Sequence, residues 1–469
     1  MMTKQRGELS SPAALVIAGL AALIGSLDTA LNIAFPDLTT DFDLDVTAVQ
    51  WMVVSYVLTY ACLLLPIGRI ADRWGHRLVL VVGLVVSTLA FALAGGAPSY
   101  RWLFAARILQ GVGVACISAA APALITLSVS SDRRGRALGA YQMSAAVGLA
   151  LGPLIGGVLV RAIGWRGVFW FRVPLSLVLL LAIVAVPFSR NRDAIDDRPL
   201  DLPGAGLLIV GTAALLFVVS IGRSVGWGSH RVLIGAALGI VAVVAFLKVE
   251  LRSSSPLIDL KLFRNPGFGL ANVLNVLSSA TMFAVWLLVP FYLVEVLGFG
   301  AIASGAILTV TPACTAAVAP LAGRLADRLG TASVSSVGLG VEAVGLAVAS
   351  RLGAQTSGVW LVVALAVIGL GIGLFQVPNM SFVMGSVARS SQGVAGAMTQ
   401  MMRTSGIVLG ASCVALLFAV RRESRGSKLS ISELDPTWMA AFHDVFVAAT
   451  ALCTLTAIVS MLPHGPDDV

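Results

Sequence analysis

Charged residues are scarce in this sequence. Asp, Glu, Lys and Arg make up 12% of the 469 residues, hydrophobic residues make up 58%, and the mean hydropathy is +0.95. Because a water-soluble domain is about one quarter charged, this composition excludes one and indicates an all-α integral membrane protein. Its apolar runs are long and apolar on every side, which favours helices over the alternating strands of a barrel.

Several signatures of chemistry are also missing. The sequence contains no G-x-x-x-x-G-K-[ST] loop, which excludes nucleotide-driven transport, and no His/Cys cluster or nucleophile elbow, which argues against a metal site or a hydrolase. We therefore expect no enzymatic activity and no cofactor. The five cysteines lie in apolar runs at unrelated spacings and are interpreted as packing residues, namely Cys62, Cys116, Cys314, Cys413 and Cys453.

What the sequence does contain is fourteen apolar runs of membrane-spanning length, since a bilayer needs about 20 apolar residues per helix. The predicted spans are 13–34, 51–70, 78–97, 102–128, 138–160, 169–187, 204–222, 231–249, 268–292, 303–322, 332–350, 359–380, 394–420 and 438–461. The first run continues past signal-peptide length without a small-residue cleavage site, so we expect a retained first span.

The distribution of Lys and Arg predicts the orientation. More of them fall on the side of the N-terminus, and the first loop of the other side, PDLTTDFDLD, carries four Asp. Arg421, Arg422, Arg425 and Lys428 lie in a late outer loop and oppose this bias. We expect both termini in the cytoplasm of a bacterial cell, in the inner (plasma) membrane. The net charge of +8 needs no nucleic acid, because inner-leaflet lipid attracts the same residues.

One string occurs twice. GRIADRWGHR follows the second span and GRLADRLG follows the tenth, with an even number of spans between them, so that both copies face one side. Glycines allow tight helix-to-helix turns there. The repetition at equivalent places favours a shared structural and gating role. The alternative is that each copy is a simple tight turn. The candidate gating residues are Gly68, Asp72, Arg73, Gly75, Arg77, Gly323, Asp327 and Arg328.

Charged residues inside the predicted spans are candidates for function, because charge in a bilayer is costly unless it is paired or wet. Asp28 and Arg107 lie at similar depth, so Asp28 is expected to couple proton and substrate, or alternatively to form a permanent ion pair with Arg107. Glu342 lies near the middle of its span. It is either a second proton or cation site or a structural residue. In the structural case its candidate ion-pair partner is Arg403, which lies at comparable depth.

Several motifs resemble the major facilitator superfamily and, within it, the fourteen-span drug:proton antiporters. They are the twin loops, LFAARILQGVG at Leu103 to Gly113, LDTALNIAFP in the first span, GLALGPLIGG at Gly148 to Gly157, WRGVFWFRVP and PLIDLKLFRN. The resemblance places an antiporter motif at Gly148, Gly152, Pro153, Gly156 and Gly157. Thr29, Arg172 and Val294 depart from the pattern of the family, and Arg172 stands where an Asn is usual.

The resemblance implies two six-helix bundles that rock around a central site, at 13–187 and 268–461, with an inserted helix pair at 204–249. Linkers at 188–203 and 250–267 and cytoplasmic tails at 1–12 and 462–469 complete the predicted division. The implied function is proton-coupled export of lipophilic, cationic drugs, driven by the proton gradient. The alternatives are a dedicated exporter of one metabolite or lipid, and a non-transporting scaffold or sensor.

A cavity that accepts many drugs needs adaptable apolar surface and aromatic faces for cations. The candidate substrate contacts are Asn32, Trp51, Tyr56, Tyr60, Met143, Trp286, Tyr292, Met401 and Arg403. Taken one at a time, residues of these types are more often packing or interfacial residues than substrate contacts. The sequence leaves the oligomeric state open.

Overall fold

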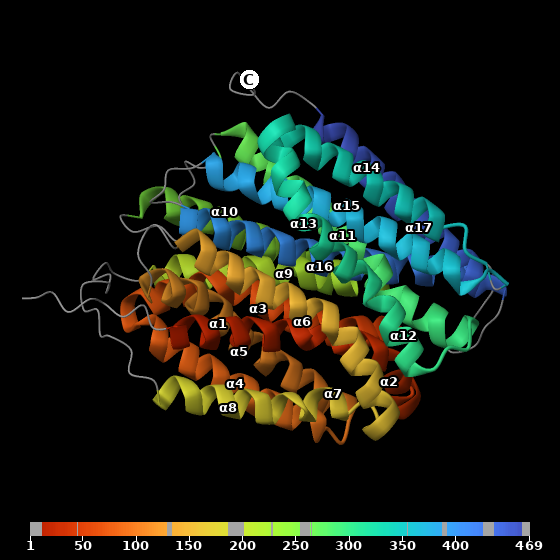
Figure 1. Cartoon of the computed structure of the whole chain (residues 1–469), viewed down its shortest axis with the longest axis horizontal. Coiled ribbons are helices and arrows are strands. Elements are labelled where there is room, and N and C mark those ends of the chain that lie inside the picture. Colours follow the sequence, from red (N-terminus) through yellow and green to blue (C-terminus); the bar gives the residue numbers. More distant parts are fainter. Residues whose placement is uncertain are drawn as a thin grey trace, which may run out of the picture.

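A computed structural model describes residues 12–44, 46–128, 134–185, 201–226, 228–253, 263, 265–353, 355–386, 392–424 and 436–461. Every regular element in these residues is a helix. Figure 1 shows long helices running side by side, with the start of the chain in the lower half and its end in the upper half. The predicted tails and most of both predicted linkers lie outside the described residues.

The N-terminal half contains six spans. Its elements are α1 (Pro12–Ser26), η1 (Leu27–Ala34), α2 (Phe35–Phe42), α3 (Val46–Trp74), α4 (His76–Gly95), α5 (Tyr100–Ser128), α6 (Arg134–Ile163), α7 (Gly167–Trp170) and α8 (Arg172–Ala185). The α7 turn and α8 together form the sixth span.

The first span differs from the prediction in two ways. Its middle, η1, is a 3₁₀ helix, which is unusual inside a span and often marks a functional segment. The residues predicted as the first outer loop are largely helical, because α2 continues to Phe42 with Pro36 in its first turn. Proline suits this position, since its missing N–H would have no partner there in any case.

A helix pair follows, α9 (Leu202–Val225) and α10 (His230–Arg252), and α9 packs against helices of both halves, α3 and α16. The C-terminal half then contains α11 (Pro266–Phe291), η5 (Tyr292–Val296), α12 (Ala301–Leu308), α13 (Val310–Leu329), α14 (Thr331–Ala349), α15 (Gly358–Gly385), α16 (Gln392–Glu423) and α17 (Pro436–Ser460). Helices α12 and α13 form one span, and η5 extends α11.

The fourteen predicted spans correspond to fourteen helical segments. Thirteen of them are long and apolar enough to cross a membrane, and in the described residues α9 contributes a shorter apolar stretch, Pro203–Leu215. The all-helical, multi-pass membrane fold is therefore confirmed. The exact division into bundles stays a prediction.

The two copies of the repeated string form equivalent turns. Gly75 separates α3 from α4 and has φ of +100°, and Gly330 separates α13 from α14 and has φ of +87°. Only glycine adopts such backbone angles without strain. The rest of each string is helical, so each turn consists of a single glycine.

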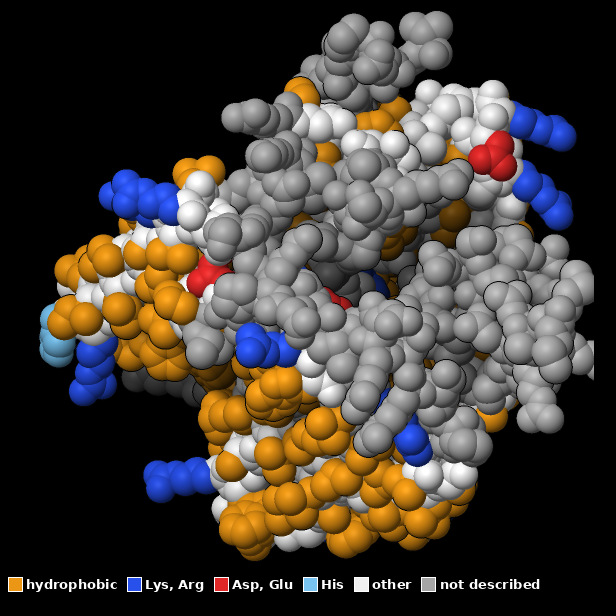
Figure 2. All heavy atoms as spheres, turned by 90° about the vertical axis from the view of Figure 1, so that its left-hand side faces the viewer, with side chains coloured by type: hydrophobic (Ala, Val, Ile, Leu, Met, Phe, Trp, Pro, Cys, Tyr) orange, Lys and Arg blue, Asp and Glu red, His pale blue; other side chains and the backbone are white. Residues whose placement is uncertain are grey.

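The two ends of the molecule differ. We call the end where α1 begins, at the left of Figure 1, the proximal face, and the opposite end the distal face. Figure 2 looks onto the proximal face and shows a central hollow with charged side chains in it, basic side chains around the rim and hydrophobic ones along the sides. Toward the distal face the halves touch, since α6 packs against α12 and η1 against α11 and α12.

Candidate functional site

Asp28 lies at the centre of a charge cluster in the N-terminal half. Arg107 of α5 donates from Nη1 to Oδ1 at 2.8 Å and from Nη2 to Oδ2 at 2.9 Å. Gln110, one turn further along α5, donates to Oδ1 at 2.8 Å. Two parallel bonds between a guanidinium and a carboxylate form the strongest common ion-pair geometry. The predicted proximity of Asp28 and Arg107 is therefore present as a direct pair.

Arg172 is a second cation on the same carboxylate. Its Nη1 donates to Asp28 Oδ1 at 2.9 Å, and its Nε donates to the Val168 carbonyl at 3.1 Å. Arg172 and Arg107 are fully buried, and Arg172 Nη2 has no hydrogen-bond partner among the described residues. The cluster of two arginines and one carboxylate thus carries one excess positive charge.

Tyrosines connect this cluster to the other half. The Arg107 guanidinium lies over the Tyr56 ring, 4.4 Å from its centroid, and the Tyr56 and Tyr60 rings stack at 6.5 Å. Tyr60 in turn lies beside Gln400 and Arg403 of α16. A continuous series of polar and aromatic groups therefore runs from Asp28 across the contact between α3 and α16.

Glu342 has a different environment. It is fully buried in α14, and its carboxylate accepts hydrogen bonds from Ser278 Oγ and Thr281 Oγ1 of α11, each at 3.0 Å. The thiol of Cys453 on α17 lies beside it. In the part of the chain that the structure describes, no Lys, Arg or His forms an ion pair with Glu342, and Arg403 lies near Tyr60. The proposed structural pair between Glu342 and Arg403 is not formed.

A narrow cavity lies between the halves. Its volume is about 20 Å³, and it is lined by Thr29, Asn32, Leu149 and Pro153 from one half and by Met282, Val285, Trp286, Leu308, Thr311 and Pro312 from the other. Asn32 and Trp286, two predicted substrate contacts, thus face the same space. Asp28, 16% exposed, lies on the same 3₁₀ segment as Thr29 and Asn32.

The glycines of the antiporter motif hold α6 close to this segment. A Cβ at Gly156 would lie 2.5 Å from the Ala30 carbonyl oxygen, and one at Gly152 would meet Thr29. Gly157, on another side of α6, touches the backbone of Ala301 in α12. The motif therefore joins the Asp28 segment on one side and the other half of the molecule on the other.

The candidate gating residues lie where expected, at the two equivalent turns. Asp72 is 3.5 Å from His76 across the first turn, and Arg77 donates to the Ile183 carbonyl at the end of α8 at 2.9 Å. The first turn is thus tied to the sixth span. Arg73, Asp327 and Arg328 are exposed.

Four of the predicted substrate contacts lie away from the cavity between the halves. Trp51 packs its ring against Phe104 and Phe217, and Met401 is buried in a separate hydrophobic cluster. Tyr292 is buried in η5 and donates to the Gly353 carbonyl at 2.8 Å. Met143 is an exposed residue of α6.

The sequence alone did not indicate the roles of Arg172, Gln110, Ser278 and Thr281. Arg172 was visible as a departure from the pattern of the family, and an arginine within an apolar run is itself a signal. The two hydroxyls gave no signal, because serine and threonine in a membrane helix usually bond to their own backbone.

Long apolar helices in two halves, buried charge in each half and a cavity between them define a membrane transporter. The sequence profile of the Major Facilitator Superfamily matches residues 17–411, and the chain belongs to this family.

The relatives include an antibiotic resistance protein and an antibiotic export protein. The puromycin resistance protein pur8 of Streptomyces alboniger is 33% identical and the match covers 95% of this chain and 90% of pur8. The cephamycin export protein CmcT of Amycolatopsis lactamdurans is 34% identical, over 96% of this chain and 93% of CmcT. A solved structure of the peptide transporter POT in complex with sulfate has a TM-score of 0.70 at 16% identity, covering 97% of this chain and 96% of that one. By its family this chain is a membrane transporter, and its relatives include proteins named for antibiotic resistance and for antibiotic export.

Proposed function

We propose that this protein exports small lipophilic molecules in exchange for protons, with its proximal face in the cytoplasm. The observation that carries the proposal is the environment of Glu342, which is fully buried and, among the described residues, has the hydroxyls of Ser278 and Thr281 and the thiol of Cys453 as its polar side-chain partners. A buried carboxylate without a cation is costly when charged. We infer that Glu342 holds a proton in this conformation and releases it in another.

Asp28 has a complementary role in this proposal. Two arginines and Gln110 occupy its oxygens, so in this conformation it is held as the anion of the cluster. When the halves rock, η1 moves against α11 and α12 of the other half, and the four hydrogen bonds to Asp28 change together. Asp28 then links substrate in the central cavity to the N-terminal half, while Glu342 carries the proton in the C-terminal half.

The charge balance around the cavity bears on the substrate class. The cluster of Asp28, Arg107 and Arg172 is net positive, and Arg403 adds a cation at the contact between the halves. These charges favour neutral or acidic substrates over the cationic class that the resemblance suggests. An acidic metabolite, such as the cephamycin that one relative's name mentions, fits this charge balance. A dedicated exporter of such a metabolite is therefore compatible with the site.

The test is transport by purified protein in liposomes with an imposed pH gradient. Three probes differ in charge: ethidium and puromycin are cations, and a cephamycin is a carboxylic acid. We expect gradient-driven uptake of the cephamycin by the wild type and its loss in Glu342→Gln.

Glu295→Gln is the matched control, because Glu295 is a half-buried carboxylate at the end of the span that contains Ser278 and Thr281. It should transport like the wild type. Gradient-driven uptake by Glu342→Gln at the wild-type rate would refute the coupling role.

A further inference from the structure

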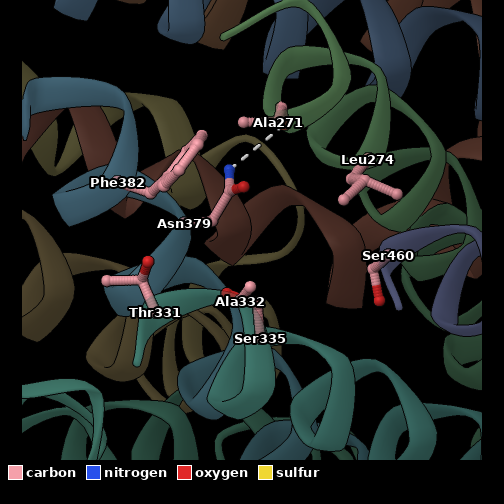
Figure 3. A pocket seen from close by; sticks show the side chains of 8 residues that line it. All are labelled: Ala271, Leu274, Thr331, Ala332, Ser335, Asn379, Phe382 and Ser460. Carbon is pink, nitrogen blue, oxygen red and sulfur yellow. Dashed lines mark hydrogen bonds between the residues drawn. The ribbon is translucent and has the colours of Figure 1, made fainter. Parts of the chain in front are cut away.

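The C-terminal half contains a second cavity, separate from the one between the halves. Its volume is about 20 Å³, enough for a water molecule. It is lined by Ala271, Leu274, Thr331, Ala332, Ser335, Asn379, Phe382 and Ser460. Figure 3 shows Asn379 and Phe382 on one side of it and Leu274 and Ser460 on the other, with the Asn379 amide bonded to the Ala271 carbonyl at 3.3 Å.

This cavity lies at one end of the helices. Thr331 is the first residue of α14, Ser460 is the last of α17, and Phe382 lies close to the end of α15. The repeated turn at Gly330 borders it and shares the orientation of the Gly75 turn. The cavity therefore sits at the proximal end of the C-terminal half, and Glu342 lies seven residues beyond Ser335 of the cavity lining, about 10 Å further in at 1.5 Å per helical residue.

Three helices connect the cavity to Glu342. Each presents a stripe of three residues at i, at i+3 or i+4, and at i+7, which lie on one helix face. The stripes are Ser335, Leu339 and Glu342 on α14, Cys453, Thr456 and Ser460 on α17, and Leu274, Ser278 and Thr281 on α11. One end of every stripe lines the cavity, and the other end contacts Glu342.

We call the contact between these three stripes the seam, and polar groups occur along it. Ser460 Oγ lies 2.7 Å from Ser336 Oγ, and Thr456 is fully buried midway along the seam. Leu274 and Leu339 separate the cavity from the Glu342 hydroxyl partners, and both are buried. The seam is thus polar at both ends and interrupted by two leucines, a pattern in which water enters only when the helices part.

We propose that Glu342 exchanges its proton with the proximal face through this seam, with the cavity of Figure 3 as its mouth and Leu274 and Leu339 as its barrier. The substrate then moves through the space between the halves, and the proton moves inside the C-terminal half. The proposal deepens the function proposed above and rests on Glu342 as the proton carrier. A separate path keeps protons from leaking through the substrate cavity.

The test measures proton exchange by Glu342 without any substrate. In reconstituted wild-type protein, infrared spectroscopy follows the carboxyl band that is missing in Glu342→Gln after a rapid pH jump on the proximal side. Ser335→Leu fills the mouth of the seam, and we expect the band to respond at least tenfold more slowly. Val337→Leu, a similar side chain on the exposed side of α14, should respond like the wild type.

If Ser335→Leu fails to fold, Ser335→Cys is made in a background that keeps the fully buried Cys453 and replaces the other cysteines. Modification with a bulky thiol reagent after reconstitution should then give the same slowing. If the proteins with a filled mouth respond at the wild-type rate, the seam is not the proton path of Glu342. Failure of the transport proposal has a different signature, since a wild type that shows no gradient-driven uptake would leave this substrate-free measurement intact.

Discussion

At the scale of single residues, the cluster around Asp28 combines a strong pair with an uncommon excess of charge. Arg107 holds the carboxylate in a bidentate geometry, and Arg172 adds a second bond to one of the same oxygens. Removing the carboxylate would leave two buried guanidinium groups, and breaking a buried pair destabilises a protein by about 3–5 kcal/mol. Loss of transport in Asp28→Asn therefore requires a stability control before it is assigned to mechanism.

Arg172→Asn changes the net charge of the cluster and keeps most of its hydrogen bonds. Arg107 and Gln110 keep their bonds to Asp28, while the net charge falls by one. A unit charge about 10 Å away at an effective dielectric constant of about 20 is worth about 1.7 kcal/mol. Puromycin and a cephamycin differ by two unit charges, so the substitution changes their relative interaction by up to about 3.3 kcal/mol, or about 300-fold. We expect the ratio of puromycin to cephamycin uptake in liposomes to rise at least tenfold.

Arg166→Asn is the control for this ratio, because Arg166 pairs with Asp41 at 3.3 Å in an exposed position. An unchanged ratio in Arg172→Asn would mean that the charge of the cluster does not select the substrate.

At the scale of elements, the decisive contact is α6 against η1. Small residues let two membrane helices approach closely, and Gly152 and Gly156 do so at the 3₁₀ segment that carries Asp28. Gly157 and the Pro153 carbonyl make comparable contacts with α12. Helix α6 is thus positioned to transmit movement between the Asp28 segment and the other half.

Gly156→Ala tests this contact. The added methyl group must push Ala30 away, so we expect uptake to fall at least tenfold and stability to fall by about 1–3 kcal/mol. Initial uptake rates and thermal unfolding in detergent measure both effects.

Gly340→Ala serves as the comparison, because no neighbouring atom lies within 4 Å of a Cβ at that helical position. It should be neutral or slightly stabilising. Equal effects of the two substitutions on uptake and stability would contradict the claim that transport depends on the close approach of α6 to η1.

At the scale of the whole molecule, most of the architecture was predictable. Long apolar runs and single-glycine turns are local signals, so the spans and the twin turns at Gly75 and Gly330 followed from the sequence. The pairing of Asp28 with Arg107 followed from equal depth. The 3₁₀ form of η1 and the partners of Glu342 depend on which helix faces meet, and Glu342 meets residues of α11 that lie 61 and 64 positions away. No periodicity in one helix reveals such contacts.

The whole-molecule claim is that substrate moving between the halves is exchanged for a proton carried by Glu342. The most direct measurement applies a cephamycin gradient to proteoliposomes at equal pH on both sides and reads the lumenal pH with a trapped dye. The account predicts that substrate entry drives protons out in the wild type and in Glu295→Gln, and that Glu342→Gln moves none. Proton movement in Glu342→Gln equal to that of the wild type, or substrate entry without proton movement in the wild type, would contradict it.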